Sequence, residues 1–299
     1  MGTRKNIFQK AIVKILINFI TPLQVFIIIL VSQFEFSVSL LIQIISFATT
    51  AHYIQFFVGL KYLTRNSQNN TKNYRLIGSQ VLHVSFPNSL YFITPIILLL
   101  FPEELLIIPI IYASVTTTIK AVFLPLQIQN LSSRTEKTNF LQSLKKILLF
   151  PPFVGIIFGL IFRVIPFLQA SNLLISIKTP ISQVTSAVSA ILIGISLVGI
   201  SKSKIKEYHK ALYQTAIIRF GLGFIIFLCF GFFFRFSSYQ TEIITILLLI
   251  ICAPPAQNNV IYSIYFQFDE KFSALAVVIL TIFGLAILPL LLMFSLNLF

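Results

Sequence analysis

The sequence consists of long runs of apolar residues separated by short polar connections. Nine runs approach the length of about 20 residues that a helix needs to cross the ~30 Å hydrocarbon core of a bilayer. They span 11–32, 36–60, 77–99, 105–128, 147–165, 179–200, 211–234, 241–265 and 272–297. Hydrophobic residues make up 57% of the 299 residues, whereas ~45–50% is usual in soluble domains. Because backbone polar groups in lipid must be paired within the chain, we predict an all-α, polytopic membrane protein with nine transmembrane helices.

The net charge of +14 is distributed unevenly along the chain. Lys and Arg gather before the first run and in the connections 61–75, 129–146 and 202–210, while the intervening connections hold few of them and carry Glu103 and Glu104. Cytoplasmic loops are enriched in Lys and Arg. We therefore predict a protein of the cell (plasma or inner) membrane with a cytoplasmic N-terminus and an extracytoplasmic C-terminus. On this interpretation the charge orients the protein, and no nucleic-acid partner is expected.

Two of the apolar runs are interrupted by proline and short polar residues. One interruption contains Pro87 within Ser85–Ser89, and the other contains Pro254 within Cys252–Asn259. A short acidic loop follows each of them, beginning at Phe101 and at Phe268, and the same offset of 167 positions relates both pairs of landmarks. This spacing indicates an internal repeat. Interrupted helices at corresponding positions of two halves indicate the binding site of a secondary transporter.

The runs divide the chain into a first repeat of four transmembrane helices at 1–128, a cytoplasmic linker at 129–146 and a second repeat of five at 147–299. Two copies of a repeat can insert into the membrane in opposite orientations only if each copy contains an odd number of transmembrane helices. We therefore expect an inverted 5+5 repeat whose first helix is missing.

Proline removes a backbone donor and clashes with the preceding helical turn, so both interrupted helices should unwind. If they cross near the bilayer midplane, the freed backbone groups and the N-terminal ends of the half-helices would suit a carboxylate. The predicted substrate-binding residues are Pro87, Asn88, Ser89, Pro95, Pro254, Pro255, Gln257, Asn258 and Asn259. The alternative is that proline only kinks these helices and that the amides hold neighbouring helices together.

Ionisable residues within apolar runs are the other candidates for function. His83 and His52 are candidate proton-coupling residues, and the alternative is a structural histidine held by hydrogen bonds. Lys120 and Arg219 are expected to extend their charged ends to the membrane surface. The runs show no acidic pair, no metal-ligand spacing and no nucleophile with its base. No catalytic residue, metal or cofactor is therefore predicted, and a membrane-embedded enzyme is disfavoured.

Three segments carry a resemblance to a known family. Ser85–Pro95 resembles the fourth-helix motif of the auxin efflux carrier superfamily, which includes the plant PIN-type auxin exporters and bacterial permeases. The stretch from Ala253 through Asp269 to Leu288-Pro289-Leu290 is similar to its last two helices. Pro151–Gly155 together with Ile193–Leu197 resembles the start of its second repeat.

The resemblance implies a ten-helix fold of two inverted five-helix repeats in which 77–99 and 241–265 are the crossing helices. It implies a scaffold domain formed by 11–32 and 147–200, with 11–32 similar to the family's second helix. It also implies a transport domain formed by 36–128 and 211–297. Elevator-type movement between the two domains and a homodimer formed through the scaffold would follow.

The expected function is that of a secondary transporter, an efflux carrier for small organic anions such as auxin-like or malate- and malonate-like carboxylates. The expected partners are this small anion and membrane lipid. The alternatives are a channel or a non-transporting receptor on the same fold. Saturable flux with counterflow would indicate a carrier, whereas unsaturable conductance would indicate a channel.

Overall fold

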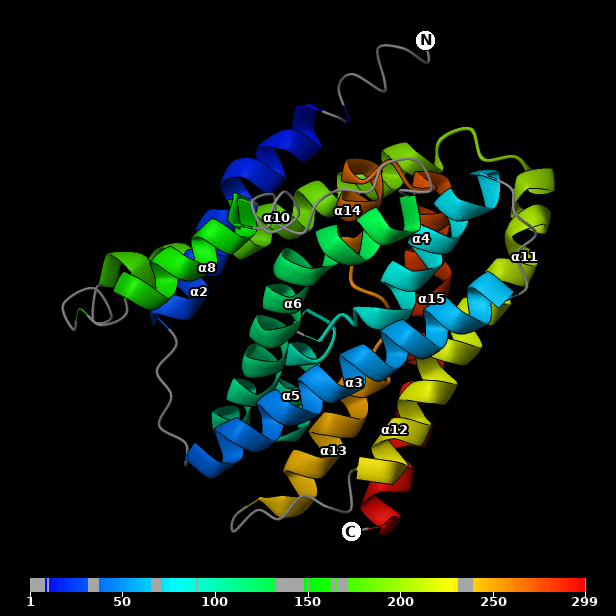
Figure 1. The fold of residues 1–299 in the computed structure, drawn as a ribbon. Coiled ribbons are helices and arrows are strands. Elements are labelled where there is room, and N and C mark those ends of the chain that lie inside the picture. The colour runs from blue at the N-terminus through cyan, green and yellow to red at the C-terminus, as the bar shows by residue number, and fades with distance from the viewer. Residues whose placement is uncertain are drawn as a thin grey trace.

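In the computed structural model the chain folds into helices, and no strand occurs among the residues that the structure describes (Figure 1). These are residues 9, 11–31, 38–65, 71–89, 91–132, 148–149, 151–162, 165, 172–230 and 239–298. The first half contains η1 (Leu16–Ile20), α2 (Thr21–Val31), α3 (Val38–Arg65), α4 (Thr71–Ser85), α5 (Thr94–Leu100), η2 (Glu103–Leu106) and α6 (Ile107–Ser132). The second half contains α8 (Pro151–Phe162), α10 (Asn172–Leu197), α11 (Lys202–Ala216), η3 (Ile217–Leu222), α12 (Gly223–Phe230), α13 (Gln240–Ile251), α14 (Asn259–Tyr265) and α15 (Glu270–Leu298).

Three helical stretches of the described chain are long and apolar enough to cross a membrane. They are Ser39–Arg65, Lys202–Phe230 and Glu270–Ser295. The first is α3, the second combines α11, η3 and α12, and the third is α15. The helical character that the composition predicts is therefore confirmed, and three helices could cross a membrane, while nine spans and an inverted repeat remain predictions.

Helices α2, α8 and α10 lie together on one side of the molecule (Figure 1). The rings of Phe26 and Phe162 meet edge to face, with centroids 6.1 Å apart. Gly155 of α8 lies directly against the backbone of Pro22, so closely that a methyl group at position 155 would collide with it. The sequence prediction assigns these helices to the scaffold.

The largest buried cluster lies between α3, α5, α6, α12 and α13. Helix α13 is buried at every position from Ile243 to Ile251. A helix that is apolar all round, as α13 is, belongs in the interior of a bundle. Its C-terminal end is consequently held deep inside the protein.

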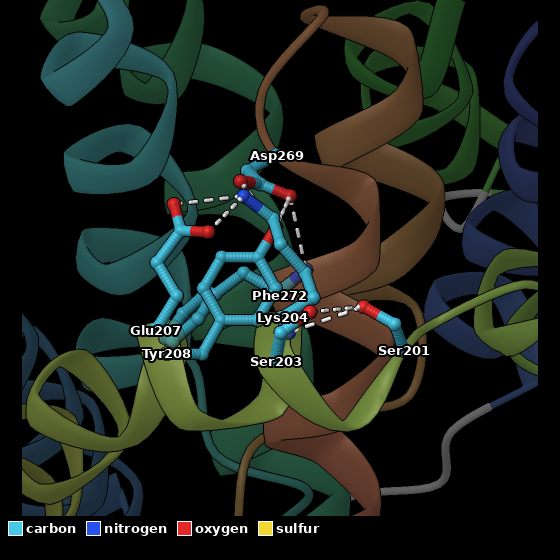
Figure 2. A network of polar contacts seen from close by, with 7 residues as sticks. All are labelled: Ser201, Ser203, Lys204, Glu207, Tyr208, Asp269 and Phe272. Atoms are coloured by element: carbon cyan, nitrogen blue, oxygen red, sulfur yellow. Dashed lines mark hydrogen bonds and ion pairs between the residues drawn. The ribbon is translucent and has the colours of Figure 1, made fainter.

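Connections that the charge pattern places in the cytoplasm meet at one end of the bundle. Near the start of α4, Arg75 Nε donates to the Gln267 carbonyl at 2.6 Å. The hydroxyl of Tyr208, in α11, reaches both carboxylate oxygens of Asp269 at 2.8 Å (Figure 2). Asp269 also accepts the backbone N–H of Phe272 at 3.0 Å, so it caps the first turn of α15.

Candidate functional site

The two helices are interrupted where proline occurs in the sequence. Helix α4 ends at Ser85, and α5 does not begin until Thr94. Helix α13 ends at Ile251, and α14 begins at Asn259. The four half-helices leave two non-helical segments inside the bundle.

These two segments cross and pair with each other. Pro87 and Pro255 form an isolated antiparallel bridge. The backbone N–H of Asn88 donates to the Pro254 carbonyl at 2.7 Å, and that of Ala256 donates to the Phe86 carbonyl at 3.0 Å. Because the bridge uses these two amides, they are not free to bind an anion, as the sequence reasoning had supposed. The crossing is a paired structure with its own hydrogen bonds.

Arg219, from η3, binds the carbonyl ends of both interrupted helices. Its side chain is fully buried. The guanidinium donates to the carbonyls of Val84, Ile251 and Ala253, each at 2.9 Å, and to Gln55 Oε1 at 2.8 Å. A cation is favoured at a helix C-terminus, where unpaired carbonyls carry partial negative charge. The expectation that Arg219 extends to the membrane surface is therefore wrong, because the guanidinium is needed in the interior.

Two further side chains cap the end of α4. His52 Nδ1 donates to the Ser85 carbonyl at 3.2 Å, and His52 is fully buried. Asn259 Nδ2 donates to the carbonyls of Leu82 and Phe86, both at 3.2 Å. The carbonyls that helix termination leaves unpaired are thus satisfied by side chains from α3, η3 and α14.

Lys120, from α6, places a second cation at the crossing. Its Nζ donates to Asn259 Oδ1 at 2.9 Å and lies 4.4 Å from the centre of the Phe86 ring and 5.0 Å from that of Tyr262. The side chain is only 6% exposed, so it does not extend to the membrane surface as expected. Among the described side chains, no carboxylate lies within ion-pair distance of Lys120. Two of the three N–H donors of Lys120 also have no acceptor among the described residues.

Six of the nine predicted substrate-binding residues are buried at the crossing, and three are not. Pro95 is exposed near the start of α5. Gln257 and Asn258 are partly exposed just before α14. The remaining predicted residues are buried at the crossing: Pro87, Asn88, Ser89, Pro254, Pro255 and Asn259. A turn at 91–93 lies between the bridge and the start of α5.

Sequence reasoning did not select Lys120, Arg219 or Gln55 for the site. The signal for the first two was visible, because an ionisable residue inside an apolar run is a functional candidate by default. Gln55 gave no comparable signal, since a single amide in a long helix has no distinguishing pattern. His83, predicted as a proton-coupling residue, is fully buried one helical turn before Pro87 and contacts Ser273.

Comparison with known proteins adds no assignment. No protein-family model matches the sequence, and no curated protein matches it. The resemblance to the auxin efflux carrier superfamily therefore remains a prediction that rests on the motifs. Within the described residues, no group of three or more His, Cys, Asp or Glu side chains could hold a metal ion.

Proposed function

We propose that this protein is a secondary transporter for small organic anions and that Lys120 binds the carboxylate beside the crossed segments. One observation carries the proposal: Lys120 is a buried cation, without a described carboxylate partner, at the point where two interrupted helices meet. Interrupted helices that meet inside a bundle are typical of transporter binding sites.

The energetics of Lys120 favour an anionic ligand. Removing an ammonium group from water costs several kcal/mol, by the order of magnitude known for buried ions. One amide oxygen and two aromatic faces offset part of this cost. A carboxylate would accept the remaining donors and neutralise the charge, and charge-assisted hydrogen bonds are the strong ones. Arg219 is not a second anion site, because its guanidinium already donates to three backbone carbonyls and to Gln55.

The proposal includes the architecture that the sequence predicts. Nine transmembrane helices would form two inverted repeats, with the N-terminus in the cytoplasm and the C-terminus outside the cell membrane. The meeting of Arg75, Gln267, Tyr208 and Asp269 at one end supports this topology, because their connections are all assigned to the cytoplasm. Helices α2, α8 and α10 would be the scaffold and the homodimer contact, against which the transport domain moves as an elevator.

Transport by purified protein in liposomes tests the proposal. We expect saturable uptake and counterflow of radiolabelled malonate, malate or indole acetate, whereas an unsaturable conductance would indicate a channel. Lys120→Met should lower uptake about 10- to 100-fold, the equivalent of the ~1.5–3 kcal/mol that a hydrogen bond to a charged group contributes. Lys206→Met is the matched control, because Lys206 is exposed on α11. Wild-type uptake at the level of empty liposomes for all three anions, or unchanged uptake by Lys120→Met, would refute the proposal.

A further inference from the structure

A second buried polar feature lies between α4, α14 and α15. His83 Nε2 is 2.7 Å from Ser273 Oγ, and Ser263 Oγ donates to Ser273 Oγ at 3.0 Å. Ser79 Oγ lies 3.5 Å from Ser263 Oγ and donates to the Asp269 carbonyl at 2.9 Å. All four side chains are fully buried. We call these four residues, Ser79, Ser263, Ser273 and His83, the polar seam.

The polar seam extends from the Asp269 end of the protein toward the crossing. Ser79 and His83 are four residues apart on α4, so they share one face of that helix. Ser263 and Asn259 are related in the same way on α14. Asn259 accepts from Lys120 and donates to the carbonyl of Leu82, the residue before His83. The seam therefore begins at a partly exposed loop and ends beside the proposed anion site.

The hydrogen bonds of the polar seam accommodate a neutral imidazole. Ser263 donates to Ser273, so the Ser273 hydroxyl is free to donate to His83 Nε2. A neutral histidine that accepts at Nε2 carries its proton on Nδ1. The Nδ1 atom is buried and has no partner among the described residues. The Ser273 contact is therefore the one hydrogen bond of the ring within the described residues.

The polar seam can also accommodate a charged imidazole without losing a hydrogen bond. A hydronium ion at the Asp269 end supplies the proton. The Ser79 hydroxyl turns from the Asp269 carbonyl toward Ser263 and passes its proton on, while Ser79 takes up the hydronium proton and water is released. The Ser263 proton then moves to Ser273, and the Ser273 proton moves to His83 Nε2. Afterwards Nε2 donates to Ser273, Ser273 donates to Ser263, and Ser263 donates to Ser79. Ser79 still donates to the Asp269 carbonyl, and every hydroxyl keeps one proton. The two arrangements differ by one proton, on His83, and by the direction of the hydrogen bonds between Ser79, Ser263, Ser273 and His83.

We propose that the polar seam conducts a proton to His83 and that this proton moves together with the anion. The inference rests on the proposed function and names its coupling ion. The charged and titratable side chains on the elements packed against α4 include His52 of α3, Lys120 of α6, Tyr208 of α11, Arg219 of η3, Tyr262 of α14 and Asp269 before α15. Of the two buried cations, Arg219 is held by carbonyls, so Lys120 is the one that a ligand can neutralise.

This arrangement explains how the anion and the proton would be coupled. The charge of Lys120 opposes a second positive charge on His83, because like charges in a poorly polarisable interior repel strongly. A carboxylate on Lys120 removes that opposition, and protonated His83 in turn favours the bound carboxylate. Such coupling is reciprocal by thermodynamic necessity.

The first test measures malonate accumulation in liposomes under an imposed pH gradient. With one proton per anion, a gradient of one pH unit should change wild-type accumulation about tenfold, since one unit is equivalent to ~1.36 kcal/mol. His83→Gln retains an amide that can contact Ser273 but cannot carry the proton. It should keep malonate counterflow and lose the response to pH. His209→Gln is the matched control, because His209 is exposed on α11.

Ser273→Ala is the second variant, because it removes one hydroxyl from the polar seam and leaves His83 in place. It should also lose the pH response. The inference is overturned if wild-type accumulation ignores the gradient while malonate counterflow is present, or if both variants retain the tenfold response.

A readout that does not depend on transport separates this inference from the proposed function. In nanodiscs with ¹⁵N-histidine, malonate added at pH 6.5 should shift the His83 ring nitrogens toward the imidazolium form, and Lys120→Met should abolish this shift. A ring that stays neutral while malonate uptake persists refutes the coupling alone. Absence of uptake, together with absence of any malonate-induced shift, refutes the proposed function and the coupling with it.

Discussion

Lys120 Nζ donates a hydrogen bond to Asn259 Oδ1 at 2.9 Å, and the orientation of that amide is fixed from its other side. Asn259 Nδ2 donates to the carbonyls of Leu82 and Phe86, both at 3.2 Å. Since carbonyl groups only accept, the amide oxygen must face Lys120. One side chain thereby connects the end of α4, the start of α14 and the buried cation of α6.

We predict that Asn259→Ala is strongly destabilising and that Lys120→Met partly reverses the effect. Without the amide, the ammonium group keeps only aromatic contacts, and an uncompensated buried charge costs about 3–5 kcal/mol. Removing the charge as well removes that penalty. Thermal unfolding in detergent should therefore give a higher melting temperature for the double variant than for Asn259→Ala. Additive losses would show that Asn259 does not stabilise the cation.

A second prediction concerns Arg219. Arg219→Met leaves the carbonyls of Val84, Ile251 and Ala253 buried without this partner, and each unsatisfied group costs about 1–3 kcal/mol. We expect a markedly lower melting temperature and aggregation in size-exclusion chromatography. Arg219→Lys should be intermediate, because one ammonium lacks the planar fork that reaches several carbonyls. Arg65→Met is the control, since Arg65 is exposed at the end of α3. Equal melting temperatures for the Arg219 and Arg65 variants would contradict the prediction.

A third prediction separates the backbone of Asn88 from its side chain. The Asn88 contact to Pro254 uses the backbone N–H, which alanine retains and proline lacks. Asn88→Ala should preserve the melting temperature, whereas Asn88→Pro should lower the stability by about 1–3 kcal/mol because the Pro254 carbonyl loses its partner. Malonate uptake by Asn88→Ala then reports on the side chain alone. If the two variants melt alike, the bridge does not stabilise the crossing.

The location of the crossing was predictable from the sequence because proline acts locally. Pro87 and Pro254 are each followed by short polar residues, and this combination indicated the ends of α4 and α13 to within a few residues. Proline alone does not suffice, because Pro180 and Pro289 lie inside α10 and α15. Helix character followed equally directly from the apolar runs. What the sequence could not show is which groups satisfy the exposed carbonyls, because those partners come from other helices, as Arg219 does, 135 positions from Val84.

The two buried cations were misinterpreted for a related reason. Lys120 and Arg219 each lie in an apolar run, and a long basic side chain in such a run commonly reaches the membrane surface. The interior carries a partial negative charge only after two helix C-termini have been brought together, and that is a tertiary property. Pro95 was assigned to the site as part of the motif Ser85–Pro95, but it is exposed near the start of α5.

The last prediction tests the membrane topology. Pro102, between α5 and η2, and Ser203, in the first turn of α11, are both exposed and lie on connections assigned to opposite sides. In a background with Cys229→Ser and Cys252→Ala, a membrane-impermeant maleimide should label Pro102→Cys but not Ser203→Cys on intact cells. Inside-out vesicles should give the reverse pattern. The cysteine-free background is the control for non-specific reaction. Labelling of both positions from the same side would exclude the assigned topology, because an odd number of crossings must separate them.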